Sequence, residues 1–252
     1  IKWYDNFTNY ANALLSAIDN LKREYVSPEM LSKHIADAET DFENIDDLVH
    51  EKGAYKGQMK SPYRDLKKQI EKNQELVSLY IDFQAAMEEA QLYDFTDMLT
   101  ELVRACEREP DLLLQLQEEY QYILVDEHQD SNNLQNRMIE LLGSFHENPN
   151  IFVVGDDKQS VYRFQGASPD YFYGFQNKYP GAVVVSLVSN YRSSQSVLDI
   201  AHALLPNPTT LTAHAGHADV IADLGVYTTD GAELFALAHR IKDLIQSGTE
   251  AS

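Results

Sequence analysis

Two adjacent acids directly after a short apolar run have the composition of a site for a metal ion and a water molecule. Residues 122–125 read Y-I-L-V, which is typical of a strand buried on both faces of a parallel sheet. Asp126 and Glu127 follow at the carboxyl end of this strand, where open α/β sheets bind their ligands. One carboxylate could hold Mg²⁺ while the other orients or deprotonates an attacking water. The alternative is a strand that ends in solvated acids.

A second polar loop, residues 155–167, follows the apolar run 151–154. Gln159 in this loop could sense a phosphate or the attacking water. Tyr162 and Phe164 flank Arg163, and aromatic rings beside an arginine suit the stacked bases of a single strand. The alternative is that both rings belong to the hydrophobic core.

A third loop, N-Y-R-S-S from residue 190, follows a further predicted strand at 182–187. Its arginine, Arg192, could neutralise charge on a phosphoryl group in transfer. Taken alone, such an arginine is more often a surface or salt-bridge residue. Three loops at strand ends therefore carry residues that nucleoside-triphosphate chemistry requires.

The elements that must position these loops follow from apolar periodicity. Residues 1–92 are predicted to be helical, with helix starts at Ser27-Pro28 and Ser61-Pro62. From Tyr93 onward strands and helices alternate, which implies a parallel sheet and an α/β fold. A fourth strand is predicted at 220–227. Further helices are predicted from Tyr93 towards Pro110, from Pro169, and at 112–119, 134–142, 195–205 and 232–246, the last with Asp230 and Glu233 as a capping box.

Composition limits the class of protein. The 252 residues are 44% hydrophobic, as in a globular protein, and their net charge of −20 argues against a generally basic nucleic-acid binder. The single cysteine, Cys106, excludes an intramolecular disulfide and fits a reducing compartment such as the cytoplasm. No apolar run reaches about 18 residues, so no membrane span is expected. The chain starts with neither an initiator methionine nor a signal peptide, and a piece of a longer chain is expected.

Charge is unevenly distributed along the helical part. Residues 37–51 hold seven acids and no Lys or Arg, whereas residues 52–72 hold seven Lys or Arg and two acids. The cations recur every four residues, and glycines and a proline among them favour a basic loop that leads into a helix. A solvated face and a phosphate-binding surface are both open interpretations. The cations concerned first are Lys52, Lys56, Lys60 and Arg64.

Taken together, the loops resemble motifs of the UvrD/PcrA/Rep family of superfamily 1 DNA helicases. D-E-H-Q-D at 126–130 is similar to motif II, residues 155–167 are similar to motif III, and N-Y-R-S at 190–193 is similar to motif IV. Y-D-F-T-D-M-L at 93–99 looks like the family's D-F-D-D-L segment. The order and spacing of the four agree over residues 93–205.

The resemblance implies a role for each matching position. Asp126, with Glu127 beside it, would form the Mg²⁺ site, and Glu127 would be the general base. Gln159 would contact the γ-phosphate of ATP and couple it to DNA. Tyr191 would stack on adenine and Arg192 would act as an arginine finger. Tyr162 and Phe164 would stack on single-stranded bases beside Arg163, and Lys52, Lys56, Lys60 and Arg64 would contact phosphates of the nucleic acid.

The sequence also departs from the family pattern at particular positions. His128 replaces the usual aromatic of motif II, Phe164 stands where Trp is common, and Gln165 stands where Arg is common. No G-x-x-x-x-G-K-[ST] loop is present. The segment 53–61 is superficially similar, but its spacing is wrong and it follows no predicted strand. The sequence therefore resembles the middle part of a helicase.

The resemblance implies an incomplete RecA-like parallel sheet of the P-loop NTPase type with an N-terminal helical insertion. Residues 1–92 would be the insertion called 1B, 93–188 part of the first RecA-like core, and 189–252 the start of the second. The complete protein would be an ATP-dependent DNA helicase that moves 3′–5′ along single strands and opens duplexes at junctions, with DNA-repair or replication proteins as further partners. The isolated chain is expected to be inactive. The alternatives are a non-catalytic binding or interaction module that keeps the fold, and part of a helicase–nuclease.

Overall fold

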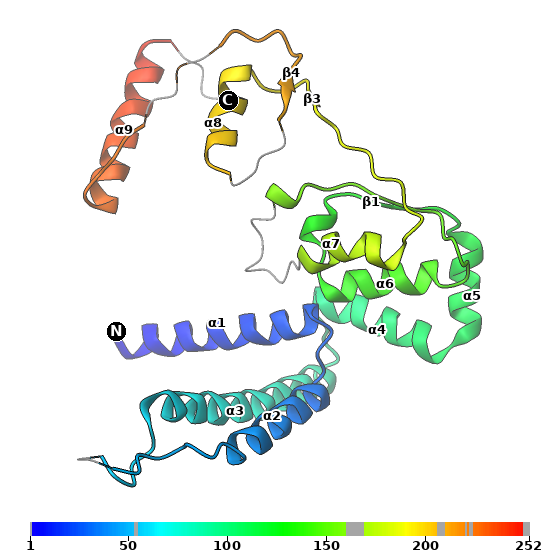
Figure 1. Ribbon diagram of the computed structural model, residues 1–252, viewed down its shortest axis with the longest axis vertical. Helices are drawn as coiled ribbons and strands as arrows, with labels where there is room; N and C mark the ends of the chain where they lie inside the picture. The colour runs from blue at the N-terminus through cyan, green and yellow to red at the C-terminus, as the bar shows by residue number, and fades with distance from the viewer. Residues whose placement is uncertain are drawn as a thin grey trace. The chain divides into compact units, whose positions relative to one another are not determined.

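The computed structural model describes residues 2–52, 55–159, 169–205, 210–219, 221 and 224–248 (Figure 1). These residues belong to two compact units, Ile1–Ala182 and Val183–Ser252. The described helices of the first unit are α1 (Lys2–Arg23), α2 (Pro28–Glu43), α3 (Ser61–Glu89), α4 (Phe95–Arg108), α5 (Pro110–Glu119), α6 (Asn133–Gly143) and α7 (Pro169–Lys178). Its strands are β1 (Ile123–Val125) and β2 (Ile151–Val153), followed by the 3₁₀ turns η1 (His128–Asp130) and η2 (Asp157–Gln159).

The helices α2 and α3 begin where the sequence predicts them. The Ser27 hydroxyl accepts a hydrogen bond from the Met30 N–H at 3.2 Å, so a serine cap and Pro28 in the first turn start α2. The helices α2 and α3 lie side by side (Figure 1) and bury one small apolar cluster between them. Its members are Ile35, Ile70 and Val77, with Leu31 and Phe42 packed against them. The described residues between α2 and α3 form a loop, which confirms the predicted basic loop leading into a helix.

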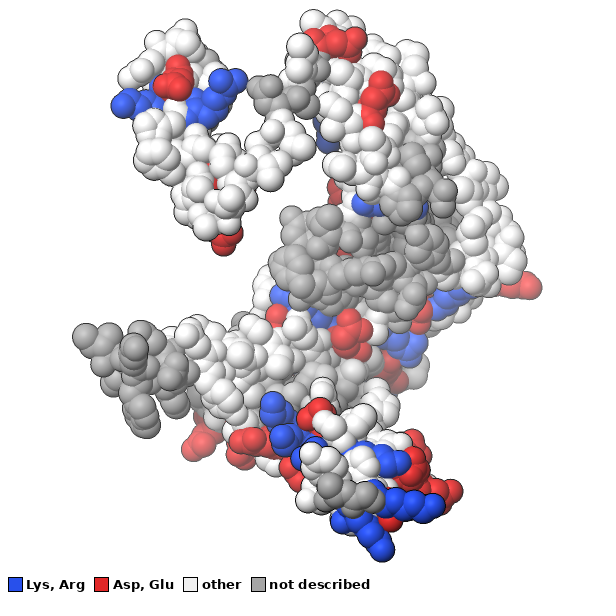
Figure 2. Space-filling model, turned by 60° about the vertical axis from the view of Figure 1, so that its left-hand side comes forward, with Lys and Arg blue, Asp and Glu red and all other residues white. Residues whose placement is uncertain are grey.

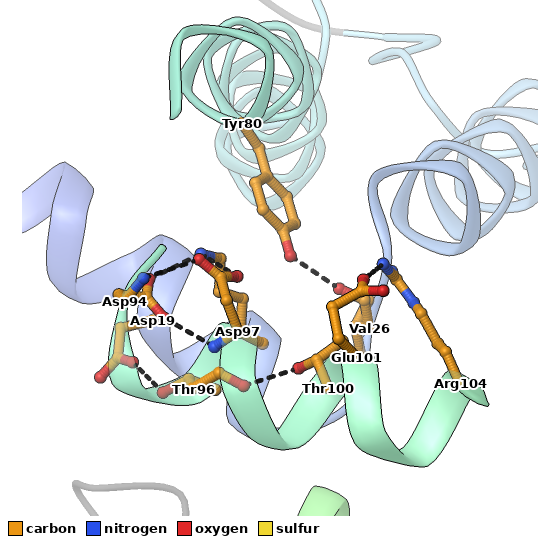
Figure 3. A network of polar contacts seen from close by, with 10 residues as sticks. Asp19, Val26, Tyr80, Asp94, Thr96, Asp97, Thr100, Glu101 and Arg104 are labelled. Atoms are coloured by element: carbon orange, nitrogen blue, oxygen red, sulfur yellow. Dashed lines mark hydrogen bonds and ion pairs between the residues drawn. The ribbon is translucent and has the colours of Figure 1, made fainter. Parts of the chain in front are cut away.

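The helix α1 is joined to α4 by a buried lysine. The Lys22 ammonium lies 2.6 Å from a carboxylate oxygen of Asp94 and 2.6 Å from one of Asp97, and its side chain is 2% exposed. Asp94 and Asp97 also cap α4 reciprocally through their backbone N–H groups, at 2.7 and 3.0 Å. Figure 3 shows this network, with Thr96 donating to Asp19 and Tyr80 of α3 donating to the Val26 carbonyl.

The electrostatics of this junction favour the charged form of the Asp94 carboxylate. Burial acts to raise the pKa of Asp94, but hydrogen bonds from Lys22 and from the Asp97 N–H outweigh it and lower that pKa below its ordinary value. A second link lies just beyond the end of α1, where the Tyr25 hydroxyl donates to Glu107 at 2.7 Å. Glu107 also accepts from Arg137 of α6 at 2.8 Å. Three helices of the first unit are therefore tied together by ion pairs and charged hydrogen bonds.

The strands β1 and β2 run parallel and connect through α6. Their register pairs Ile123 with Ile151, Leu124 with Phe152, and Val125 with Val153. The main core of this region lies between α4 and α6, where Val103, Cys106, Leu134 and Leu141 are buried. The parallel pairing confirms an α/β fold at this level.

The prediction that the first strand is buried on both faces is wrong. Ile123 and Val125 are half-buried, whereas Leu124 is 74% exposed and its neighbour Phe152 is 63% exposed. Successive side chains of a strand point to opposite faces. Among the described residues α6 packs against β1, and Leu124 and Phe152 on the other face stay largely exposed. An unbroken apolar run indicates a strand that is suited to burial on both faces. It cannot show that packing elements are present on both sides.

The predicted third strand is also wrong. Residues 182–188 form no strand, and Val183 is 87% exposed. β-branched residues favour strands only where a neighbouring strand supplies hydrogen bonds and packing, and none of the described strands pairs with this segment. The described part of 220–227 likewise forms no strand.

The second unit is a small parallel pair with two helices. It contains β3 (Ser189–Asn190), α8 (Gln195–Ala203), β4 (Thr212–Ala213) and α9 (Asp230–Gln246). The strands pair Ser189 with Thr212 and Asn190 with Ala213. The helix α9 is capped by Thr229, whose hydroxyl accepts from the Ala232 N–H, so the predicted cap at Asp230 is one residue late. None of the helices in the described ranges is long and apolar enough to cross a membrane.

Candidate functional site

The loops after β1 and β2 lie next to each other, as the sequence predicts. The Val154 N–H donates to the Val125 carbonyl at 2.8 Å, and the His128 N–H donates to the Val154 carbonyl at 2.9 Å. These two bonds extend the parallel ladder beyond the strands and fix the start of motif II (residues 126–130) against the start of motif III (residues 155–167). The carboxyl edge of the strand pair therefore brings both motifs into contact.

Glu127 occupies a strained backbone position. Its φ of 48° and ψ of 42° place it in the left-handed region, which residues with a side chain seldom adopt. The preceding residue supports this turn, because the Asp126 carboxylate accepts the Glu127 N–H at 2.9 Å. Both carboxylates are exposed to solvent. Strain of about 1–2 kcal/mol at such a residue is typical of a functional position held by its surroundings.

Gln129 connects the two motifs. Its side chain is buried, with 1% exposed, and its amide NH₂ donates to a Glu127 carboxylate oxygen at 2.7 Å. Its amide oxygen accepts the Asp156 N–H at 3.0 Å. The Asp156 carboxylate in turn accepts from the Gln159 side chain at 2.8 Å. The structure thus brings together Glu127 and Gln159, two predicted site residues, through two residues for which the sequence indicated no role.

His128 faces the interior of the first unit. It is buried, its Nε2 lies 3.0 Å from the Asn136 amide oxygen, and its ring meets Phe175 edge-on at 5.9 Å between centroids. Burial lowers the pKa of His128, and the Asn136 contact opposes this effect without cancelling it. The side chain that departs from the family's usual aromatic therefore contributes to packing beneath the motif II turn.

Tyr191 and Arg192 belong to the second unit. The Asn190 side-chain oxygen accepts the N–H groups of Arg192 at 2.9 Å and Ser193 at 2.8 Å, which closes a tight turn after β3. The Arg192 side chain is exposed, and the Tyr191 ring lies 5.5 Å from the His214 ring and is also largely exposed. The turn presents both side chains, whereas Tyr162, Arg163 and Phe164 lie outside the described residues.

The basic segment is exposed but interleaved with acids. Lys52 and Lys56 lie in the loop before α3, and Arg64 lies on α3, all three exposed. Lys60 differs because it forms an ion pair with Asp47. Figure 2 shows Lys and Arg side chains mixed with Asp and Glu over the lower part of the molecule, which contains α2 and α3. The described surface is therefore no uniform basic patch.

The segment 93–99, which looks like the family's D-F-D-D-L motif, lies at the α1–α4 junction. Asp94 and Asp97 bind Lys22 there, and Phe95 is exposed. Sequence reasoning missed Lys22 because a lysine in an amphipathic helix is normally solvated. It missed Gln129 and Asp156 because the hydrogen bond that joins them crosses from one loop to the other.

Parallel strands whose ends carry paired acids and amides define an α/β protein with a site at the carboxyl edge of its sheet. The chain belongs to the UvrD/REP helicase family, since the model of the UvrD/REP helicase N-terminal domain matches residues 3–180.

Similar proteins carry helicase names. The chain is 28% identical over 253 residues to the putative ATP-dependent DNA helicase YjcD of Bacillus subtilis (strain 168), which covers 98% of this chain and 32% of that protein. It is 35% identical over 130 residues to the ATP-dependent DNA helicase PcrA of Leuconostoc citreum, covering 52% of this chain and 17% of that protein. It is 33% identical over 153 residues to the ATP-dependent DNA helicase PcrA of Staphylococcus aureus (strain Mu50 / ATCC 700699), and this match covers 60% of this chain and 21% of that protein. The chain spans about a third or less of the length of these relatives.

Proposed function

We propose that this chain is part of an ATP-dependent DNA helicase that couples ATP hydrolysis to 3′–5′ movement along single-stranded DNA and to unwinding at junctions with duplex. One observation carries the proposal: motifs II and III of a UvrD/REP family chain meet at one sheet edge, where Glu127 and Gln159 are joined through Gln129 and Asp156. A module that only bound nucleic acid would have no need to hold a carboxylate in a strained turn.

The elements correspond to parts of such a motor. Residues 1–92, with α1 to α3, are proposed to be the helical 1B insertion, and residues 93–188 part of the first RecA-like core. Residues 189–252 are proposed to be the linker, motif IV and the start of the second RecA-like domain. The paired parallel strands with α6 between them support the core assignment. A cytoplasmic location, with DNA-repair or replication proteins as partners, completes the proposal.

The residues fit a magnesium site of the kind that works with a nucleotide. The described residues contain no group of three or more His, Cys, Asp or Glu side chains placed to hold a metal ion. Mg²⁺ bound with a nucleotide needs only one or two carboxylates, because waters and phosphate oxygens supply its other ligands. Asp126, with Glu127 beside it, offers these exposed carboxylates, and Mg²⁺ bound there would neutralise phosphate charge.

The protein residues then divide the reaction between them. Glu127 takes the proton of the attacking water, and the left-handed turn holds its carboxylate at the sheet edge for that task. Gln159 contacts the γ-phosphate, and its hydrogen bond to Asp156 connects this contact, through Gln129, to motif II. Tyr191 stacks on adenine, and Arg192 acts on the γ-phosphate as an arginine finger.

Single-stranded DNA is proposed to follow motif III and the basic segment. Tyr162 and Phe164 stack on bases next to Arg163, and Lys52, Lys56 and Arg64 contact phosphates. Lys60 was also predicted to contact a phosphate. It already forms an ion pair with Asp47, so a phosphate would have to compete with that carboxylate.

The substitution Glu127→Gln in the complete parent protein tests this function. The amide keeps the shape of the carboxylate and can no longer take a proton, so turnover should fall by roughly 10² to 10⁴-fold. ATP binding, measured with a fluorescent nucleotide analogue, should persist. The control is Glu118→Gln, an exposed acid of α5. Near-normal turnover in Glu127→Gln would show that Glu127 is not the base. A wild-type protein without DNA-stimulated ATPase would favour the non-catalytic module.

A further inference from the structure

The side chain of Gln129 is the most completely buried polar group in the motif II turn, and both ends of its amide are used. Only the amide oxygen can accept the Asp156 N–H, and only the NH₂ group can donate to the Glu127 carboxylate, so these two partners fix the orientation of the side chain. With 1% of Gln129 exposed, water cannot replace either bond. The amide is therefore held in one position and cannot be exchanged for a hydrocarbon without loss.

The Glu127 carboxylate, by contrast, needs an anchor. It is exposed, and its backbone lies in the left-handed region that its side chain disfavours. A hydrogen bond between a neutral donor and a carboxylate is short and strong, and the 2.7 Å bond from Gln129 is of this kind. A buried, immobile donor two residues away thus restrains the rotamer of an exposed acid.

The restraint continues into the neighbouring loop. Asp156 contributes its N–H to Gln129 and its carboxylate to both the Gln159 side chain and the Lys158 N–H, at 2.8 and 2.9 Å. An unbroken series of hydrogen bonds therefore leads from Glu127 through Gln129 and Asp156 to Gln159. A shift of residues 156–159 must either break the bond to Gln129 or move the amide that holds Glu127.

We propose that Gln129 is a positioning residue that sets the Glu127 carboxylate for proton transfer and links its position to the loop of Gln159. The inference rests on the proposed function, in which Glu127 is the base. A purely structural Gln129 would instead stabilise the fold and leave the turnover of each folded molecule unchanged.

Two substitutions in the complete parent protein separate these roles. Gln129→Glu keeps the length and the acceptor for Asp156, but replaces the donor that faces Glu127 with a second carboxylate. Gln129→Met keeps the length and removes both bonds. The matched control is Gln117→Met in α5, whose amide donates to the Leu141 carbonyl at 2.7 Å and lies in neither motif. Steady-state ATPase with and without single-stranded DNA, ATP affinity and thermal unfolding are measured for each variant.

For a positioning role, Gln129→Glu should lower kcat by roughly 10²-fold while the KM for ATP changes by less than about threefold. Gln117→Met should change the unfolding temperature without changing kcat. A kcat within about twofold of the wild type in a folded Gln129→Glu protein overturns the proposal. Failure of the proposed function is distinguishable, because it appears as a wild-type protein with no ATPase.

If the Gln129 variants do not fold, Asp156→Ala decides, because Asp156 is only partly buried. This change keeps the N–H that Gln129 uses and removes the carboxylate that holds Gln159. A loss of kcat of about tenfold or more, with ATP affinity retained, supports the linked arrangement. A kcat within about twofold of the wild type overturns it. Where Gln129→Glu folds, its loss and that of Asp156→Ala should combine less than multiplicatively, since both act on one series of bonds.

Discussion

Glu127 shows how much of this site depends on single residues. The sequence places Asp126 and Glu127 at a strand end, and it places Gln159 after the next strand, because parallel strands end at the same sheet edge. The contact between the motifs was therefore predictable. The left-handed angle of Glu127 and the bonds of Gln129 were not, since they depend on the register of two loops that are distant in the chain.

Arg192 offers a test at the same scale. Its turn is closed by the Asn190 side chain and the backbone N–H groups of residues 192 and 193, so the arginine side chain is not needed to form it. Arg192→Ala should therefore leave unfolding unchanged and, in the complete protein, lower ATP turnover by roughly 10³-fold or more. Arg192→Lys, which keeps the charge and loses the planar fork, should recover only part of the rate. Turnover near the wild-type value in Arg192→Ala would identify a surface arginine.

Individual elements were predictable to different degrees. Helices follow from local signals, and the predicted starts at Ser27-Pro28 and Ser61-Pro62 lie within a residue of those in the structure, although of these two helices only α2 has a side-chain cap. Strands require a partner, which explains why 151–154 became β2 beside β1 while the similar apolar run at 182–187 formed no strand. Periodicity alone cannot supply that information.

The α1–α4 junction gives the first prediction at this scale. Lys22→Met keeps the length of the side chain but leaves Asp94 and Asp97 without their cation. The chain should lose about 3 kcal/mol of unfolding free energy, the lower end for a broken buried pair, because Asp94 is partly exposed. Thermal and urea unfolding measure the loss. Arg23→Met, which removes a partly exposed pair with Asp19 on the same helix, should cost less than about 1 kcal/mol. Equal effects of the two substitutions would contradict the structural role of Lys22.

The basic segment, residues 52–72, gives the second prediction at the scale of elements. Changing Lys52, Lys56 and Arg64 to Gln in the complete protein should weaken binding to every DNA sequence alike. It should also reduce the slope of log affinity against log salt by roughly 0.7–0.9 per lost contact. Lys60→Gln alone should change the slope less, because Asp47 already pairs with Lys60. Phe164→Ala is the uncharged comparison and should weaken single-strand binding by about 1–3 kcal/mol at an almost constant slope. An unchanged slope in the triple variant would leave the segment as a solvated face.

At the scale of the whole molecule, the exposed apolar surface is the main departure from an ordinary globular chain. Leu124, Phe152, Val183 and Val185 are each more than half exposed although their residue types favour a core. The apolar runs of the sequence predict a sheet that is covered on both faces. The described residues instead form two short strand pairs. Sequence patterns could therefore identify the fold class and the sheet edge that carries the site, but not the extent of the sheet.

The isolated chain should consequently bind no nucleotide productively. Its 252 residues contain no G-x-x-x-x-G-K-[ST] loop, so Asp126, Glu127 and Gln159 have no backbone cradle to hold the phosphates beside them. ATP hydrolysis by purified residues 1–252 should stay at the level of the Glu127→Gln form of the same chain, with or without single-stranded DNA. The exposed apolar face should also make the chain self-associate, which sedimentation over a concentration series measures. DNA-stimulated hydrolysis by the wild-type chain, absent in its Glu127→Gln form, would show that these residues alone hold the phosphates, and the expectation that the isolated chain is inactive would then be wrong.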